Sequence, residues 1–248
     1  MAIRKTHPGR VRGARLPLVV LLVAGLILGA CGQDTEVSPP TTGPIDDATE
    51  GFTFLGLGKT SRYSDNLREK LRQRLGHDVA ESKMPLSLAI HPPGFMESQL
   101  PGIARLNGRL NYAPRERIEH NILRLAYRYA HKKGTPFKRV ELVFSRYTDK
   151  PLLFYVKSDK AGGEMLASIK AKYGQYKEVA DEARELTTLV WNQSPDVLAV
   201  TIGTDRFGDP EYEIWIFYGA NLEELAATEE KQRRVRRDNL NEVGKKAF

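Results

Sequence analysis

The chain has a single cysteine, Cys31, among its 248 residues. Without a second cysteine it cannot form an internal disulfide, and a zinc site built from several cysteines is excluded as well. The sequence also lacks the HExxH pattern of zinc peptidases and the GxSxG pattern of serine hydrolases. These absences leave the position of Cys31 as the feature to be explained.

The amino-terminal segment lacks acidic residues, and its apolar run is short for a membrane-spanning helix. Residues 1–15 contain five Lys or Arg and no Asp or Glu, and Leu16–Leu28 is an uncharged apolar run of 13 residues. A spanning helix needs about 20 apolar residues. A basic start followed by a short apolar run and small residues is typical of a secretory signal.

The tetrapeptide Leu28-Gly29-Ala30-Cys31 resembles the lipobox of bacterial lipoproteins, and the resemblance covers residues 1–31 only. It implies cleavage before Cys31, a diacylglyceryl group on the Cys31 thiol and often acylation of the new amino end. Two or three acyl chains hold a protein durably, because each buried CH₂ contributes about 0.8 kcal/mol. Gly32 stands where aspartate favours retention in the inner membrane, so the resemblance implies an outer-membrane protein facing the periplasm. A plain signal peptide or amino-terminal anchor with an incidental cysteine is the alternative.

The remaining chain divides by composition into a tether, a body and a charged end. Residues 32–50 contain five acidic residues, three prolines and no basic residue. After a signal peptide at 1–30, we therefore expect a lipidated cysteine and an acidic, proline-rich tether at 31–50, with a reach of roughly 25 Å. Apolar residues are spread evenly through 51–228, which predicts a globular α+β body. Residues 229–248 have few core residues and predict a charged helix end or tail.

The net charge of +7 would by itself suggest a nucleic-acid partner. Five of the 38 basic residues lie in the signal, however, which leaves 33 basic against 31 acidic residues in the exported chain. The balance is nearly neutral, and export also separates the protein from DNA and RNA. We expect no nucleic-acid partner, no metal site and no cofactor.

The spacing of apolar residues predicts an α+β fold with a mainly antiparallel sheet of about five strands and helices packed on one face. Leu67, Leu71 and Leu75 recur every fourth residue and predict a helix that ends at Gly76. The strongest predicted helix covers 114–133, with further helices at 164–173 and from Asn221 onward. We expect strands at 52–57, 86–90, 140–144, 152–157, 188–191, 197–204 and 212–218. Residues 91–112, which contain three prolines and three glycines, predict a long connection.

Two groups of residues are candidates for binding a partner. Trp215 and Phe217 share one face of a predicted strand, where they form either a surface patch or part of the core. The second group is the basic run Arg233, Arg234, Arg236 and Arg237. Such charges contribute about 1 kcal/mol each at an anionic membrane surface, although many runs of this kind are solvated helix ends.

No catalytic constellation is recognisable, so we expect a non-catalytic envelope protein that binds another protein as an accessory subunit. A periplasmic hydrolase or cell-wall enzyme is one alternative, and would use His91 with Glu97 or His120 with Glu116. The Glu116–His120 spacing instead favours a solvated pair on one face of the predicted helix. A carrier of lipid or another small ligand, with 91–112 as its lid, is the other alternative.

Overall fold

The computed structural model describes residues 45, 50–90, 93–113 and 115–246. Cys31, the predicted signal and most of the predicted tether therefore lie outside the described residues, as do His91 and Pro114. Ile45 belongs to the predicted tether, yet its backbone N–H donates a hydrogen bond of 2.7 Å to the Leu55 carbonyl. Ile45 therefore contacts the globular body.

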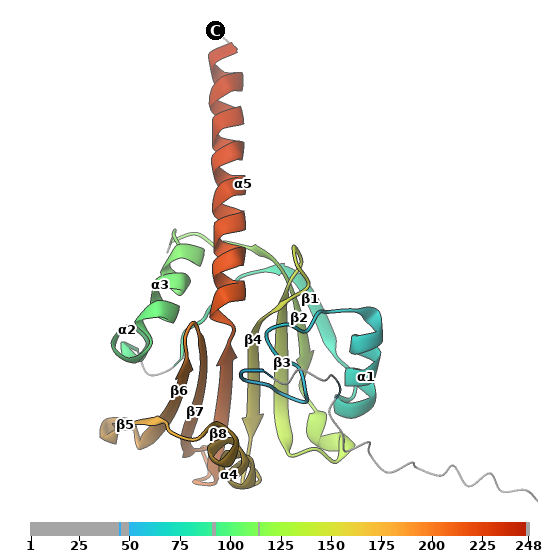
Figure 1. The fold of residues 1–248 in the computed structure, drawn as a ribbon, viewed down its shortest axis with the longest axis vertical. Helices are drawn as coiled ribbons and strands as arrows, with labels where there is room; N and C mark the ends of the chain where they lie inside the picture. Colours follow the sequence, from blue (N-terminus) through green and yellow to red (C-terminus); the bar gives the residue numbers. More distant parts are fainter. Residues whose placement is uncertain (1–44, 46–49, 91–92, 114, 247–248) are drawn as a thin grey trace, which may run out of the picture. The chain divides into compact units, whose positions relative to one another are not determined.

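The body is built on one antiparallel sheet of eight strands in the order β1-β2-β3-β4-β8-β7-β6-β5 (Figure 1). Its strands are β1 (Val79–Met84), β2 (His120–Tyr127), β3 (Phe137–Ser145), β4 (Pro151–Ser158), β5 (Lys177–Asp181), β6 (Leu186–Gln193), β7 (Asp196–Thr204) and β8 (Pro210–Phe217). The α+β class and the antiparallel pairing are confirmed. The expected number of about five strands is wrong, because β1, β2 and β5 were not predicted.

Helices cover both faces of the sheet, which corrects the prediction of a single covered face. On one face, α1 (Asp65–Leu75) and α4 (Gly162–Tyr173) pack on a cluster that includes Phe154 and Tyr218. On the other face, α2 (Phe95–Gln99), α3 (Pro101–Leu110) and the start of α5 (Gly219–Lys246) pack on a cluster that includes Phe217. Consecutive residues of β4 are buried on alternate sides, so both faces of the sheet are apolar and both require a cover.

The helix predicted from Leu67, Leu71 and Leu75 is confirmed as α1, and these three side chains are its buried residues. The Ser64 hydroxyl accepts a hydrogen bond of 3.1 Å from the Leu67 amide and caps the amino end. Gly76 follows the last turn with φ of 90°, a conformation that favours glycine. The hairpin of β3 and β4, the helix α4 and the strands β6, β7 and β8 also lie where the sequence predicts them.

The predicted helix at 114–133 is wrong. Its centre is strand β2, and a short 3₁₀ turn, η1 (Ala130–Lys133), follows. Strand β2 pairs with β1 on one side and β3 on the other, and both of its faces are largely buried. A strand buried on both faces does not alternate apolar with polar residues. Its apolar positions therefore matched a helical spacing by coincidence.

The region expected to be a strand at 86–90 and a connection at 91–112 also folds differently. Leu86, Leu88 and Ile90 are buried, but residues 85–90 belong to no helix or strand. Helices α2 and α3 occupy 95–110, with Pro101 in the first turn of α3.

Residues 52–57 form a turn with a single bridge between Phe54 and Leu57 rather than a strand. A second 3₁₀ turn, η2 (Glu182–Arg184), follows β5.

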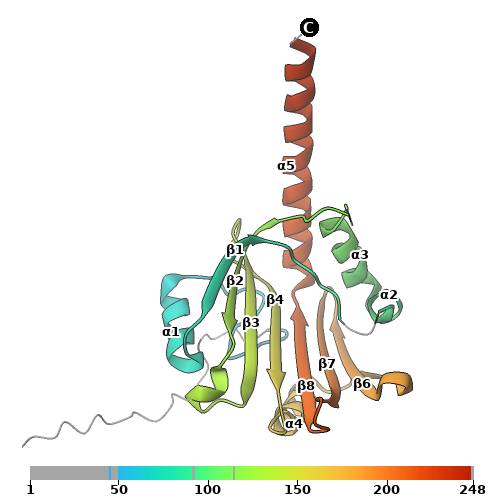
Figure 2. The same cartoon turned by 180° about the vertical axis from the view of Figure 1, so that it is seen from behind.

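Helix α5 is 28 residues long, or about 42 Å at 1.5 Å per residue. It begins at Gly219, whose amide donates a hydrogen bond of 2.9 Å to Asp196 Oδ1. Asn221, where the sequence predicts the helix to begin, is already helical, and its side chain donates to the carbonyls of Lys59 and Pro151. The buried residues of α5 all lie between Gly219 and Ala226. The later turns continue past the end of the sheet, clear of the other elements (Figure 1 and Figure 2).

Candidate functional site at the root of helix α5

A cleft of about 560 Å³ lies where α5 passes Tyr112, residues 116–119 and the start of β2. The side chains that line it come from four separate parts of the chain: β1, the start of β2 with the segment before it, the β3–β4 turn and α5. They are Lys83, Tyr112, Glu116, Arg117, Ile118, Glu119, His120, Asn121, Tyr147, Glu229, Gln232, Arg233 and Arg236. The cleft is therefore assembled by the fold, and no short stretch of sequence contains it.

His120 and Glu229 form the buried centre of this cleft. The His120 side chain is 1% exposed, and its Nδ1 lies 2.6 Å from Glu229 Oε2. Glu229 Oε1 accepts a second hydrogen bond, 3.1 Å long, from the Asn121 amide. Because an ionised carboxylate can only accept, the His120 proton is on Nδ1. The other ring nitrogen, Nε2, is buried and has no hydrogen-bond partner among the described residues.

Positive charge exceeds negative charge around the pair. Four lining residues are cationic, namely Lys83, Arg117, Arg233 and Arg236, and three are carboxylates, namely Glu116, Glu119 and Glu229. Glu119 pairs with Arg117 at 3.5 Å, and Glu229 is occupied by His120. A neutral His120 leaves the charge of Glu229 in place, so the four cations face three carboxylates, an excess of one positive charge.

Aromatic residues position the groups on α5. The Arg233 guanidinium lies 3.6 Å from the centre of the Tyr112 ring, a cation–π contact. The Tyr147 hydroxyl donates a hydrogen bond of 3.0 Å to Gln232 Oε1. Burial raises the pKa of Tyr147, and the nearby Glu229 carboxylate adds to the increase, so the hydroxyl keeps its proton at neutral pH.

Arg109 fixes the root of α5 from the side of α3. Its guanidinium contacts Glu223, and its Nε lies 2.9 Å from Glu230 Oε1. The hydrogen bonds from Arg109 hold the pKa of Glu230 below its usual range. Helix α5 is thus connected to α3 through Arg109 and to β2 through His120.

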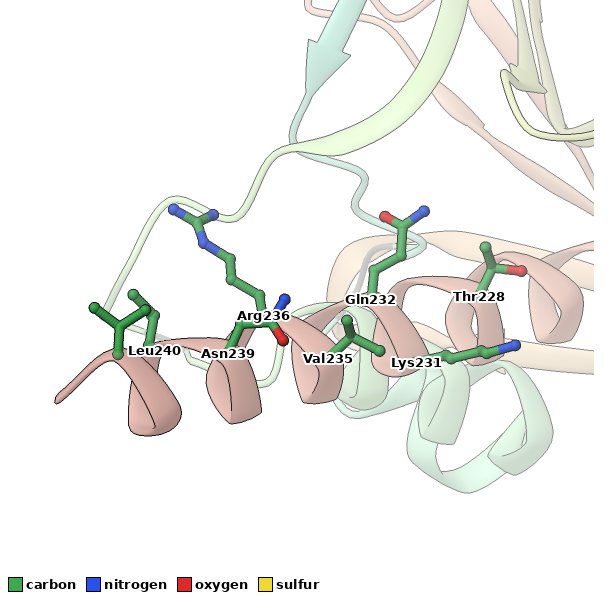
Figure 3. A pocket seen from close by; sticks show the side chains of 8 residues that line it. Thr228, Lys231, Gln232, Val235, Arg236, Asn239 and Leu240 are labelled. Carbon is green, nitrogen blue, oxygen red and sulfur yellow. The ribbon is translucent and has the colours of Figure 1, made fainter. Parts of the chain in front are cut away.

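An exposed strip of side chains runs along α5 from Thr228 toward its carboxyl end (Figure 3). Val235, Leu240 and Val243 are 52%, 63% and 67% exposed and lie within one side of the helix. Thr228, Gln232, Arg236 and Asn239 flank them in the same strip. All of these residues come from a single helix, so the strip is an open surface and not an enclosed cavity.

The structure separates the residues predicted to bind a partner. Phe217 is fully buried, and Trp215 is half-buried and lies 4.3 Å from Tyr155 between ring centres, so this aromatic pair belongs mainly to the core. Arg233 and Arg236 line the cleft, whereas Arg234 and Arg237 do not.

The prediction of a solvated Glu116–His120 pair is wrong, because His120 is buried at the start of β2 and pairs with Glu229 instead. Sequence reasoning missed Glu229 entirely. The two residues are 109 positions apart, and no local pattern links them. Glu97 lies exposed in α2, and its proposed partner His91 is outside the described residues.

Within the described parts of the chain, no three His, Cys, Asp or Glu residues are grouped so that they could hold a metal ion. No helix there combines the length and the apolarity that crossing a membrane requires. Comparison with protein-family models, with curated proteins and with solved structures found no match.

Proposed function

We propose that this chain is a lipid-anchored protein of the bacterial cell envelope that binds another protein through the outer turns of α5 and catalyses no reaction. The observation that carries the proposal is the exposed apolar strip of Val235, Leu240 and Val243 on a helix that is packed only at its root. Three aliphatic side chains on one side of a projecting helix are typical of the surface that enters a groove of a partner.

The charges of the same segment define the kind of groove. Residues 231–246 contain seven basic and two acidic residues. A groove with an apolar floor and acidic edges would bury the strip and pair with the flanking cations. Because the root of α5 is fixed by Arg109 and His120, the helix is formed before binding, so little ordering entropy is lost on association.

The lipobox resemblance of Leu28–Cys31 supports the proposed location. We propose acylation of Cys31 and attachment to the outer membrane on the periplasmic side, with the acidic segment that follows as the tether. The basic run would then face an envelope partner and not a nucleic acid.

Replacement of Leu240 by glutamate tests the proposed partner surface. We expect Leu240→Glu to abolish co-purification of one stoichiometric envelope protein from crosslinked membranes of the source bacterium. Asn241→Glu is the matched control, because it adds the same charge on the far side of the helix and should leave co-purification unchanged. The partner should then bind the purified protein with the same dependence on Leu240. Equal effects of the two variants, or crosslinks to lipid alone, would reject the proposal.

Replacement of Cys31 by alanine tests the anchor separately. We expect Cys31→Ala to leave the membrane fraction and to appear as a soluble or signal-retaining form. Mass spectrometry of the natural protein should show an acylated amino-terminal cysteine. A mutant that is still processed and labelled by lipid would contradict the anchor without bearing on the strip of α5.

A further inference from the structure

We propose that the cleft at the root of α5 binds a phosphate group, with His120 Nε2 and the cations Lys83, Arg233 and Arg236 as its contacts. Arg236 lines both the cleft and the exposed strip, but this inference does not depend on the proposed protein partner, because phosphate binding is measured on the isolated protein.

The first argument is the unused nitrogen of His120. Buried polar atoms in folded proteins nearly always have a hydrogen-bond partner. Nδ1 has one in Glu229, whereas Nε2 has none among the residues that the structure describes. The ring is 1% exposed and lines the cleft, so a ligand seated there can supply the missing partner once a neighbouring side chain of the cleft moves aside from Nε2.

The second argument is the match between this nitrogen and a phosphate. In a neutral ring Nε2 accepts a hydrogen bond, and in an imidazolium ring it donates one. A phosphate monoester has a second pKa of about 6, so near neutral pH it carries both P–O–H and P–O⁻ groups. It can therefore pair with Nε2 in either state, which a carboxylate that is fully ionised at this pH cannot do.

The third argument is charge. After the internal pair Arg117–Glu119 is removed, the cations Lys83, Arg233 and Arg236 face the carboxylates of Glu116 and Glu229, because the neutral His120 ring does not cancel the charge of Glu229. The remaining excess of one positive charge favours an anionic ligand. Arginine also presents its donors in a planar fork that matches two phosphate oxygens. Arg233 is already held against Tyr112, which reduces the entropy lost when it binds.

The phosphate has two possible sources, a free phosphate in solution and the headgroup of a phospholipid. The shared chemistry is the phosphoryl oxygens, but a headgroup diester has one charge and no P–O–H group. Titration calorimetry on the full-length protein in a neutral detergent, at constant ionic strength, distinguishes the sources. One arm uses inorganic phosphate, and the other uses short-chain phosphatidylglycerol.

The variants come as a matched pair on one helix. Arg233→Gln/Arg236→Gln removes two cations that line the cleft, and Arg234→Gln/Arg237→Gln removes two that do not. Both lose the same net charge. We expect the first to weaken phosphate binding at least tenfold and the second to change it less than twofold. His120→Gln should weaken binding as well, and the arginine pair keeps the test valid if that variant does not fold.

Binding of inorganic phosphate alone, with this dependence on Arg233 and Arg236, supports the site and a soluble ligand. Binding of both probes with the same dependence supports the site and adds the lipid headgroup as a ligand. Absence of phosphate binding, or equal weakening by both double variants, would overturn the proposal. Binding of the diester without phosphate would overturn the role of Nε2.

Discussion

Glu229 receives two hydrogen bonds from consecutive residues at the start of β2, one from the His120 ring at 2.6 Å and one from the Asn121 amide at 3.1 Å. The carboxylate therefore ties α5 to a strand that lies 109 residues earlier in the chain. It also fixes which nitrogen of His120 carries the proton.

Glu229→Gln should destabilise the protein by about 2 kcal/mol, because a neutral amide replaces the charged acceptor of two hydrogen bonds, and its NH₂ group is itself a donor. Glu242→Gln is the control on the same helix, since Glu242 forms only an exposed pair with Lys246 and should change stability by less than about 0.5 kcal/mol. Urea unfolding followed by circular dichroism measures both. Equal stabilities of the two variants would contradict the role assigned to Glu229.

Replacement of leucine by alanine should destabilise the protein strongly at the start of α5 and hardly at all near its end. Leu222 is fully buried against the sheet, so Leu222→Ala should cost about 2–5 kcal/mol. Leu240 is exposed, so Leu240→Ala should change the free energy of unfolding by about 0.5 kcal/mol or less in the isolated protein. Denaturant midpoints compare the two directly. A large loss for Leu240→Ala would show that the outer turns pack on the body.

Gly219→Ala should destabilise the protein by about 3 kcal/mol, because the added methyl group would overlap a backbone atom. A Cβ at this position would lie 2.1 Å from the Pro195 carbonyl oxygen. At Gly108 in α3 a Cβ has no neighbour within 4 Å, so Gly108→Ala should be neutral or stabilising by up to about 1 kcal/mol. Thermal unfolding of the two variants should shift the melting temperature in different directions, and a common shift would argue against this packing.

Stability at low pH should depend on Asp78. Its carboxylate is fully buried and accepts hydrogen bonds from Arg68 Nε at 2.7 Å and Arg72 Nε at 2.8 Å. Burial alone would raise the pKa of Asp78, but the bonds from Arg68 and Arg72 outweigh it and hold the pKa below its ordinary value. A carboxyl whose pKa falls on folding stabilises the protein above its unfolded pKa, about 3.9 for aspartate, and loses that contribution as pH falls through the folded pKa.

We therefore expect Asp78→Asn to be less stable by about 2 kcal/mol at neutral pH and to lose less stability than the wild type below about pH 4. The exposed Asp238→Asn variant should follow the wild-type curve, since Asp238 makes only a long surface contact with Arg237. Urea unfolding at a series of pH values measures the difference. Parallel curves for Asp78→Asn and wild type would refute the linkage.

The parts of the fold that the sequence predicts correctly are those with one buried side. In α1, the leucines at every fourth residue face the core and the charged residues face solvent, so the helical period of the apolar residues is apparent in the sequence. Strand β2 has two buried sides, and β1 has almost none, so neither shows a clear period of two. The proline and glycine residues of 91–112 concealed α3, although Ile103, Leu106 and Leu110 have a helical spacing.

The candidate site was predictable only in part. The basic run was visible in the sequence, but which of its members line the cleft depends on the rotation of α5 about its axis. The burial of His120 depends on the pairing of β2 with β1 and β3, and its contact with Glu229 depends on the whole sheet topology. Such long-range pairings leave no mark in a local spacing.

Arg109 contacts Glu223 and Glu230, which lie seven residues apart and therefore on the same stripe of α5. Two attachments along one stripe fix the azimuth of a helix as well as its tilt. Because α5 is unbroken to Lys246, that azimuth is inherited by every later turn. The side of α5 on which Leu240 is exposed is thus determined in part by Arg109 of the neighbouring helix α3, at a distance from Leu240 itself.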